Sequence, residues 1–137
     1  MGEPLIFKGV EEQTLKRDEL LNKLRTQIEW LEKGRVAFPE VMNTIHKLIR
    51  TRKVFMKYLE GTSSPRFEGE AAELMKTLLE FTLWVSIEDE IELLNRVKEL
   101  AKVRDDATPK DEEVIKGEIK ELELFKRKAQ EFISRIG

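Results

Sequence analysis

The residue types that most often carry acid–base or metal chemistry are scarce in this sequence. It has one histidine, His46, and no cysteine among its 137 residues. A single imidazole needs a neighbouring carboxylate or a second histidine to bind a metal or to act as a base. The residue three positions earlier is Asn43, so the Glu-x-x-His pattern of di-iron helical bundles is absent. We predict that His46 is an ordinary surface residue and that the chain holds no metal or cofactor.

Carboxylates are plentiful, and Glu88, Asp89, Glu90 and Glu92 form an acidic cluster. Paired carboxylates can transfer protons or bind Mg²⁺ when their geometry is fixed. Apolar residues interleave with these four, so we expect most of the carboxylates to face water and to join ion pairs. The sequence also lacks glycine-rich phosphate loops and the G-x-S-x-G turn of hydrolases. We therefore predict no catalytic residues and no enzymatic activity.

A basic stretch lies between Val41 and Leu59, with five basic residues and no acidic one. Against nucleic-acid binding, the whole chain has a formal net charge of −2 and a pI near 5.7. No stacking aromatic interleaves the basic residues except Tyr58. Nucleic-acid association is therefore the second hypothesis. The residues that would form this face share the solvent side of a predicted helix: Lys47, Arg50, Lys53 and Lys57.

The fifth basic residue, Arg52, falls in the apolar stripe between Leu48 and Phe55. A guanidinium in such a stripe must be paired or must extend to water at the edge of the core. We expect an acidic partner from the region after residue 70, either Glu80 or Glu88.

Apolar spacing of three and four residues predicts an all-α protein, a four-helix up-down bundle. Gly34 should cap the first helix, and Thr108 with Pro109 should begin the last. Gly117, inside the last helix, is expected to mark a close contact between helices. The predicted division is an N-terminal arm over residues 1–10 and one bundle domain over 11–137. The predicted helices cover residues 11–33, 39–60, 70–104 and 109–137.

The predicted third helix changes its apolar face near Ser86. Ala71, Leu74 and Leu78 keep one stripe, whereas Ile91, Leu94 and Val97 lie about 100° around the helix. The helix must therefore kink, change partners or break. A kinked helix is the favoured interpretation. The alternative is a new helix capped by Ser86, with Asp89 at its third position.

The first half of this segment is apolar around nearly its whole circumference, which is typical of a helix buried on all sides. A single bundle of this size covers one broad face of each helix, so a second copy is expected to cover the rest. The favoured function is a non-enzymatic protein–protein interaction or structural module that forms a homodimer. The predicted interface consists of Leu79, Leu83, Trp84 and Ile87, assisted by Leu5, Ile6 and Phe7.

The composition is that of a heavily charged chain, with 38% charged residues, three Asn and three Gln. This pattern favours a hyperthermophilic source. Runs such as Glu118-Ile119-Lys120-Glu121 give the chain the overall character of small orphan proteins of viruses and plasmids of hyperthermophilic archaea, which it resembles in style alone. The sequence lacks a signal peptide and any apolar run long enough to span a membrane, so the cytoplasm is the predicted compartment, the host's if the source is viral.

Overall fold

The computed structural model describes residues 5–60, 73, 76, 77, 79, 80 and 86–136. Its described residues contain helices and no strand, which confirms the predicted all-α class. The helices are α1 (Leu5–Glu32), α2 (Phe38–Glu60), α4 (Glu88–Ala101) and α5 (Pro109–Ile136). None of them is long and apolar enough to cross a membrane.

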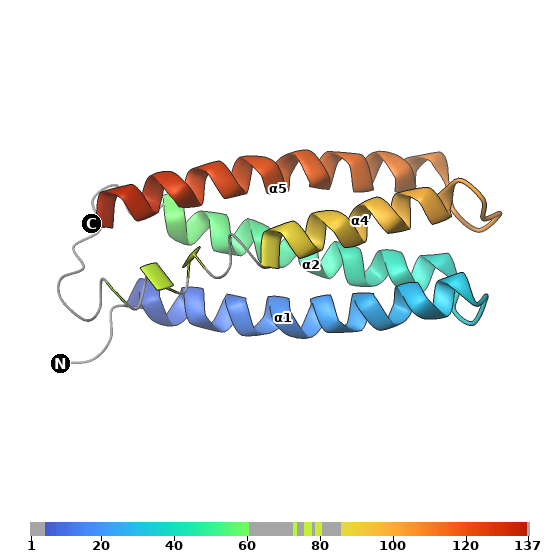
Figure 1. Cartoon of the computed structure of the whole chain (residues 1–137), viewed down its shortest axis with the longest axis horizontal. Coiled ribbons are helices and arrows are strands. Elements are labelled where there is room, and N and C mark those ends of the chain that lie inside the picture. Colours follow the sequence, from blue (N-terminus) through green and yellow to red (C-terminus); the bar gives the residue numbers. More distant parts are fainter. Residues whose placement is uncertain (1–4, 61–72, 74–75, 78, 81–85, 137) are drawn as a thin grey trace.

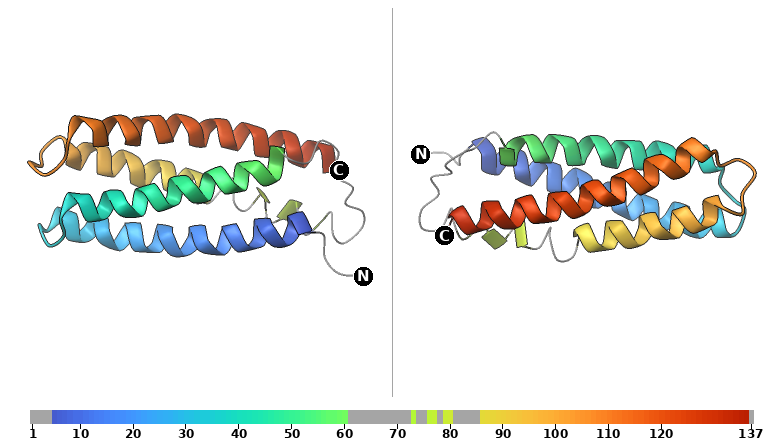
Figure 2. Two further views of the ribbon diagram at one scale, coloured as in Figure 1. Left: turned by 180° about the vertical axis from the view of Figure 1, so that it is seen from behind. Right: turned by 90° about the horizontal axis from the view of Figure 1, so that it is seen from above.

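The four helices pack around a common axis (Figures 1 and 2). α1 packs against α2 and α4, and α5 packs against the same two helices. α1 and α5 therefore lie diagonally opposite each other, as do α2 and α4. The bundle consists of two hairpins, α1–α2 and α4–α5, that meet along the contacts α1–α4 and α2–α5.

The α1–α2 turn has the glycine cap that the sequence predicts. Gly34 has a φ of +68°, a backbone conformation that glycine adopts without steric cost. The backbone N–H of Gly34 donates to the carbonyl of Leu31 at 3.1 Å, and that of Arg35 donates to the carbonyl of Trp30 at 2.7 Å. These two bonds define a Schellman motif, which satisfies the last carbonyls of the helix.

The start of α5 also agrees with the sequence. The Thr108 hydroxyl accepts from the backbone N–H of Asp111 at 3.1 Å, and the Asp111 carboxylate accepts from the N–H of Thr108 at 3.0 Å. This reciprocal pair is a capping box, with Pro109 as the first helical residue.

Both turns lie together at one end of the bundle because Arg104 and Asp106 connect them. Arg104 donates through Nε and Nη2 to the two carboxylate oxygens of Asp106, at 2.8 and 2.9 Å. The same carboxylate accepts from the backbone N–H of Phe38 at 2.8 Å, and Nη1 of Arg104 lies 3.5 Å from the Leu31 carbonyl oxygen. The bonds from Arg104, together with the Phe38 N–H, hold the pKa of Asp106 well below its usual range. α1 and α4 run toward this end, and α2 and α5 run away from it.

Two segment boundaries differ from prediction. α1 begins at Leu5, so residues 5–10 continue the helix instead of forming an arm. Gly9 costs only about 1 kcal/mol inside a helix, which the good helix formers around it can offset. Before α4, Ser86 and Ile87 have π-helical geometry, and Ile87, at the cap position, is helical with no side-chain cap bond. The interpretation of Ser86 as a helix cap is therefore wrong. Most of the predicted helix 70–104 before Ser86 lies outside the described residues.

The core runs through all four helices and uses the predicted stripes. Phe55 and Phe125 meet at its centre with ring centroids 5.0 Å apart. Gly117 is exposed, and no atom lies within 4 Å of a Cβ added there, so the predicted close contact at this glycine is wrong. The buried side chains of the predicted stripes include Leu21, Leu24, Ile28, Leu31, Val41, Ile45, Leu48, Phe55, Leu94, Val97, Ile115, Leu122, Phe125, Ala129 and Phe132.

Candidate functional site

Two of the predicted interface residues are buried inside their own chain. Leu79 is 1% exposed and Ile87 is fully buried, and both belong to the core. They cannot form an interface with a second copy while the bundle is folded, so this part of the prediction is wrong. The apolar surface at these two positions is covered within the same chain.

The structure does not describe the side chains of the other five residues of that predicted interface. Leu83 and Trp84 lie outside the described residues. Leu5, Ile6 and Phe7 form the first turns of α1, and their side chains lie outside the description. The apolar interface stays a prediction at these five positions.

The predicted basic face of α2 is exposed at all four positions. Lys47 and Arg50 line a groove between α1 and α2. Lys53 and Lys57 are not among the residues that line this groove, and Lys53 acts electrostatically on Glu118 of α5. The use of these four residues as a nucleic-acid surface stays a prediction.

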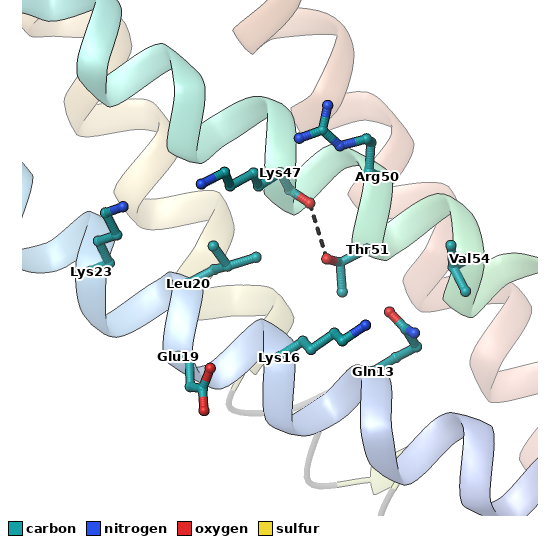
Figure 3. Close-up of a pocket in the computed structure, with 9 residues that line it drawn as sticks. All are labelled: Gln13, Lys16, Glu19, Leu20, Lys23, Lys47, Arg50, Thr51 and Val54. Atoms are coloured by element: carbon teal, nitrogen blue, oxygen red, sulfur yellow. Dashed lines mark hydrogen bonds between the residues drawn. The ribbon is translucent and has the colours of Figure 1, made fainter.

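The groove between α1 and α2 has a volume of about 560 Å³ and gathers cations from both helices (Figure 3). Lys16 and Lys23 of α1 and Lys47 and Arg50 of α2 line it, and the guanidinium of Arg50 points away from α1 in this view. We call these four residues and the surface between them the basic groove. Sequence reasoning missed Lys16 and Lys23 because they belong to a different helix and α1 as a whole carries mixed charge.

The floor of the basic groove is largely apolar. Leu20 is partly buried and Val54 is 37% exposed. Between them lies Thr51, whose hydroxyl donates to the carbonyl of Lys47 at 3.0 Å, so it is satisfied within its own helix. An incoming molecule would therefore meet methyl groups at the centre of the groove and ammonium or guanidinium groups at its rims.

The cations at the rims have no ion-pair partner among the described residues. No carboxylate in the described part of the chain lies within 4.0 Å of the charged nitrogens of Lys16, Lys23, Lys47 or Arg50. Glu19 is the single acidic residue that lines the groove, and Figure 3 shows its carboxylate pointing away from α2. The basic groove thus keeps a concentrated positive charge, although the whole chain is slightly acidic.

A second polar feature lies inside the bundle, where each helix contributes one buried charge. Nε of Arg17 on α1 donates to Oε1 of Glu90 on α4 at 3.0 Å, with both side chains 1% exposed. On the other side, Arg52 of α2 pairs with Glu118 of α5. We call these four residues the buried quartet. Glu90 is the buried member of the acidic cluster, whereas Glu88 and Glu92 are exposed and Asp89 is partly exposed, so most of these carboxylates face water as predicted.

The partner of Arg52 also differs from prediction. Arg52 is buried, as its place in the apolar stripe requires, but it pairs with Glu118 instead of Glu80 or Glu88. Glu80 is exposed, and Glu88 pairs with Lys126 at 2.8 Å. The difference arises because α2 packs against α5, which places Glu118 beside Arg52.

The buried quartet has perturbed protonation equilibria. Burial raises the pKa of Glu90 and of Glu118, and the paired guanidinium groups oppose this effect in both cases. Nη1 and Nη2 of Arg17 and Oε2 of Glu90 have no hydrogen-bond partner among the described residues. The quartet is electrically balanced, with two guanidinium groups and two carboxylates.

The sequence does hold a signal for the buried quartet. Arg17 lies four residues before Leu21 and seven before Leu24, so it falls on the α1 stripe. Glu90 stands in the same relation to Leu94 and Val97. Arg17, Glu90 and Glu118 therefore each fall within the apolar stripe of their own helix, as Arg52 does. This pattern in the sequence indicates burial for all four charged residues.

The described residues show little support for metal or imidazole chemistry. His46 is exposed, as predicted. No group of three or more His, Asp or Glu side chains in the described residues is placed to hold a metal ion.

Comparison with known proteins gives no match to a family model, to a curated protein or to a solved structure.

Proposed function

We propose that this protein is a non-enzymatic protein–protein interaction module that binds an acidic helix of a partner in the basic groove. The observation that carries the proposal is a row of cations on each side of an apolar floor between α1 and α2, none with an ion-pair partner in the described part of the chain. A helix with an apolar stripe flanked by carboxylates matches this pattern. Laying such a helix into a groove between two helices is a recurrent mode of recognition.

The groove favours a polypeptide over a nucleic acid for two reasons. Leu20 and Val54 at its floor cannot form hydrogen bonds or ion pairs with a phosphate backbone, whereas they can bury the apolar stripe of a helix. None of the residues that line the groove is aromatic, so it offers no stacking platform for bases. Nucleic-acid association is the second candidate. It is favoured by the four cations of the basic groove, because lysine and arginine side chains bind phosphate groups.

The test uses a fluorescent synthetic helix with a leucine stripe flanked by glutamates, and a labelled DNA duplex. Binding of each probe is measured by anisotropy for the wild type and for Lys23→Gln/Lys47→Gln. The matched control is Lys110→Gln/Lys116→Gln, which removes two exposed cations from α5. We expect the groove variant to bind the peptide at least about tenfold more weakly, a loss of ~1.4 kcal/mol, and the control to bind like the wild type.

A second variant, Val54→Ser, separates the two candidates. It should weaken peptide binding by about threefold or more, because apolar surface is lost from the floor. DNA binding should not change. The proposal is wrong if DNA binds more tightly than the peptide, with a steep salt dependence, and Val54→Ser affects neither probe.

Three other predictions stay part of this proposal. Self-association is supported by the opposite charges of two surfaces of the chain, whereas the homodimer as its specific form and the cytoplasm as the compartment stay predictions. We also infer that the whole chain is an up-down bundle with a long third helix kinked near Ser86. The alternating directions of the described helices and the π-helical geometry at Ser86 support this inference.

A further inference from the structure

The outer surface of α4 carries the opposite charge to the basic groove. Glu88, Glu92, Asn95 and Glu99 follow one another at spacings of four, three and four residues, so they share one face of the helix. Glu32 at the end of α1 extends the same surface, and these residues line a second groove of about 560 Å³. We call this surface the acidic face.

The acidic face repeats the layout of the basic groove with the charges reversed. Ile91 and Leu100, both partly buried, provide its apolar centre, as Leu20 and Val54 do in the basic groove. Its lining has four carboxylates and one cation, Arg96, whereas the basic groove has four cations and one carboxylate. The two surfaces are complementary in both charge and apolar content.

The part of the acidic face that lies on α4 has a length that suits the basic groove. From Glu88 to Glu99 it extends over about 16 Å at 1.5 Å per residue. The cations of α1 that line the basic groove extend over about 10 Å, from Lys16 to Lys23, by the same rise. An α4 helix laid along the groove can therefore bring at least two of its glutamates to the cations at the rims.

Existing ion pairs on the acidic face do not prevent this contact. Glu32 pairs with Arg96 at 2.6 Å, Glu88 with Lys126 at 2.8 Å, and Glu99 with Lys102 at 3.2 Å. The carboxylates in these pairs are 45 to 66% exposed, and pairs so open to water contribute about 0–1 kcal/mol each. They can exchange partners at little cost. Glu92 has no ion-pair partner among the described residues.

We infer that the occupant of the basic groove is the acidic face of α4 from a second copy of this chain. The inference rests on the proposed function, since it names the partner for the same groove. Each copy carries both surfaces, and the contact joins two different surfaces, so it is of the head-to-tail type. The bundle then self-associates through charged grooves, with its apolar core closed in each copy.

Reciprocal charge reversal tests this inference. Variant A is Lys23→Glu/Lys47→Glu, and variant B is Glu92→Lys/Glu99→Lys. The matched controls, Lys110→Glu/Lys116→Glu and Glu113→Lys/Glu123→Lys, make the same changes of net charge at exposed positions of α5. Molar mass is measured by light scattering over a range of protein concentrations, and circular dichroism checks that each variant is folded.

We expect the wild type and both controls to exceed the mass of one chain. Variants A and B alone should each associate at least about tenfold more weakly, because like charges then meet across the contact. Mixing A with B should restore association, since the reversed groove of A meets the reversed face of B. A chain that carries all four charge reversals should also associate like the wild type, because its groove and its acidic face are again opposite in charge.

Three results would overturn the inference. The first is a wild type that stays at the mass of one chain. The second is association that A and B leave unchanged, and the third is loss in A and B without recovery on mixing. In the first case, binding of the synthetic acidic helix to the basic groove would show that the proposed function holds and that the partner is a different protein. Failure of both measurements would reject the groove as an interaction site.

Discussion

Arg52 on α2 and Glu118 on α5 are joined by two hydrogen bonds, 2.7 Å from Nε to Oε2 and 2.8 Å from Nη2 to Oε1. Their side chains are 7% and 3% exposed. Such a two-point pair fixes the orientation of both side chains as well as their distance. Together with Arg17 and Glu90, the pair connects the two hairpins through the interior of the bundle. The buried quartet therefore sets the axial alignment of one hairpin against the other.

Replacing Arg52 by methionine should destabilise the protein by about 3–5 kcal/mol, because the carboxylate of Glu118 is then buried without a partner. The free energy of unfolding in guanidinium chloride measures this loss. The double variant Arg52→Met/Glu118→Leu should regain most of the stability, since no isolated charge is left. A loss below about 1 kcal/mol in the single variant would mean that Glu118 reaches water without its partner.

Glu90 gives a prediction about pH, because burial raises its pKa in the folded state. Just above the ordinary pKa of a glutamate, the folded chain binds more protons than the unfolded chain, so the Glu90 contribution to stability falls as the pH rises. Glu90→Gln removes this contribution. The stability of the wild type minus that of Glu90→Gln, measured from about pH 4 to about pH 8, should therefore decrease with rising pH and then level off. A difference that increases with pH contradicts the assignment.

Asp106 should show the opposite pH dependence. The bonds from Arg104 and from the Phe38 N–H lower its pKa, so the folded state favours the charged carboxylate. Its contribution to stability is complete above the ordinary pKa of an aspartate and is lost as the pH falls toward its folded-state pKa. Asp106→Asn should therefore differ from the wild type at about pH 6 and converge with it toward about pH 2. The neighbouring exposed Asp105→Asn is the control, and an equal effect of both variants would reject the role of Asp106.

Two glycines should respond to alanine in opposite directions. Gly34→Ala places a side chain at a φ of +68° and should destabilise the protein by about 1 kcal/mol. Gly117→Ala adds a methyl group to an exposed helix position with nothing within 4 Å, and should stabilise it by about 0.5–1 kcal/mol. Thermal or chemical unfolding measures both changes. A destabilising Gly117→Ala would mean that a helix contact exists at that position after all.

Local features of the fold could be predicted from the sequence. Gly34, Thr108 and Pro109 act through their own backbone geometry and through neighbours a few residues away, so their roles at helix ends follow from residue type and position. The apolar stripes predict the core for the same reason. The start of α1 at Leu5 differs from the predicted arm over residues 1–10, because a helix tolerates a single glycine such as Gly9.

Contacts between helices that are distant in sequence could not be predicted in the same way. The burial of Arg52 follows from its spacing within α2, but the choice of Glu118 depends on which helix packs beside α2. Leu79 is predicted as an interface residue because a single bundle of this size covers one broad face of each helix. Its burial within the chain depends on packing that the sequence does not reveal.

The basic groove contains residues that the sequence predicts and residues that only the packing of the helices brings together. Lys47 and Arg50 could be predicted from the basic stretch of α2, whereas Lys16 and Lys23 join them only because α1 packs alongside. The predicted basic face therefore contributes Lys47 and Arg50 to the groove, and the extension of the groove onto α1 follows from the three-dimensional arrangement.

Mapping where an acidic helix binds tests the central claim most directly. The measurement is a ¹H–¹⁵N correlation spectrum of the labelled wild type during titration with the synthetic leucine- and glutamate-containing helix. We predict that the largest shifts occur at Lys16, Lys23, Lys47 and Arg50 and at the groove floor, with α5 unaffected. Shifts that cluster on α5, or a spectrum that does not change at saturating peptide, would contradict the assignment of the basic groove as the interaction site.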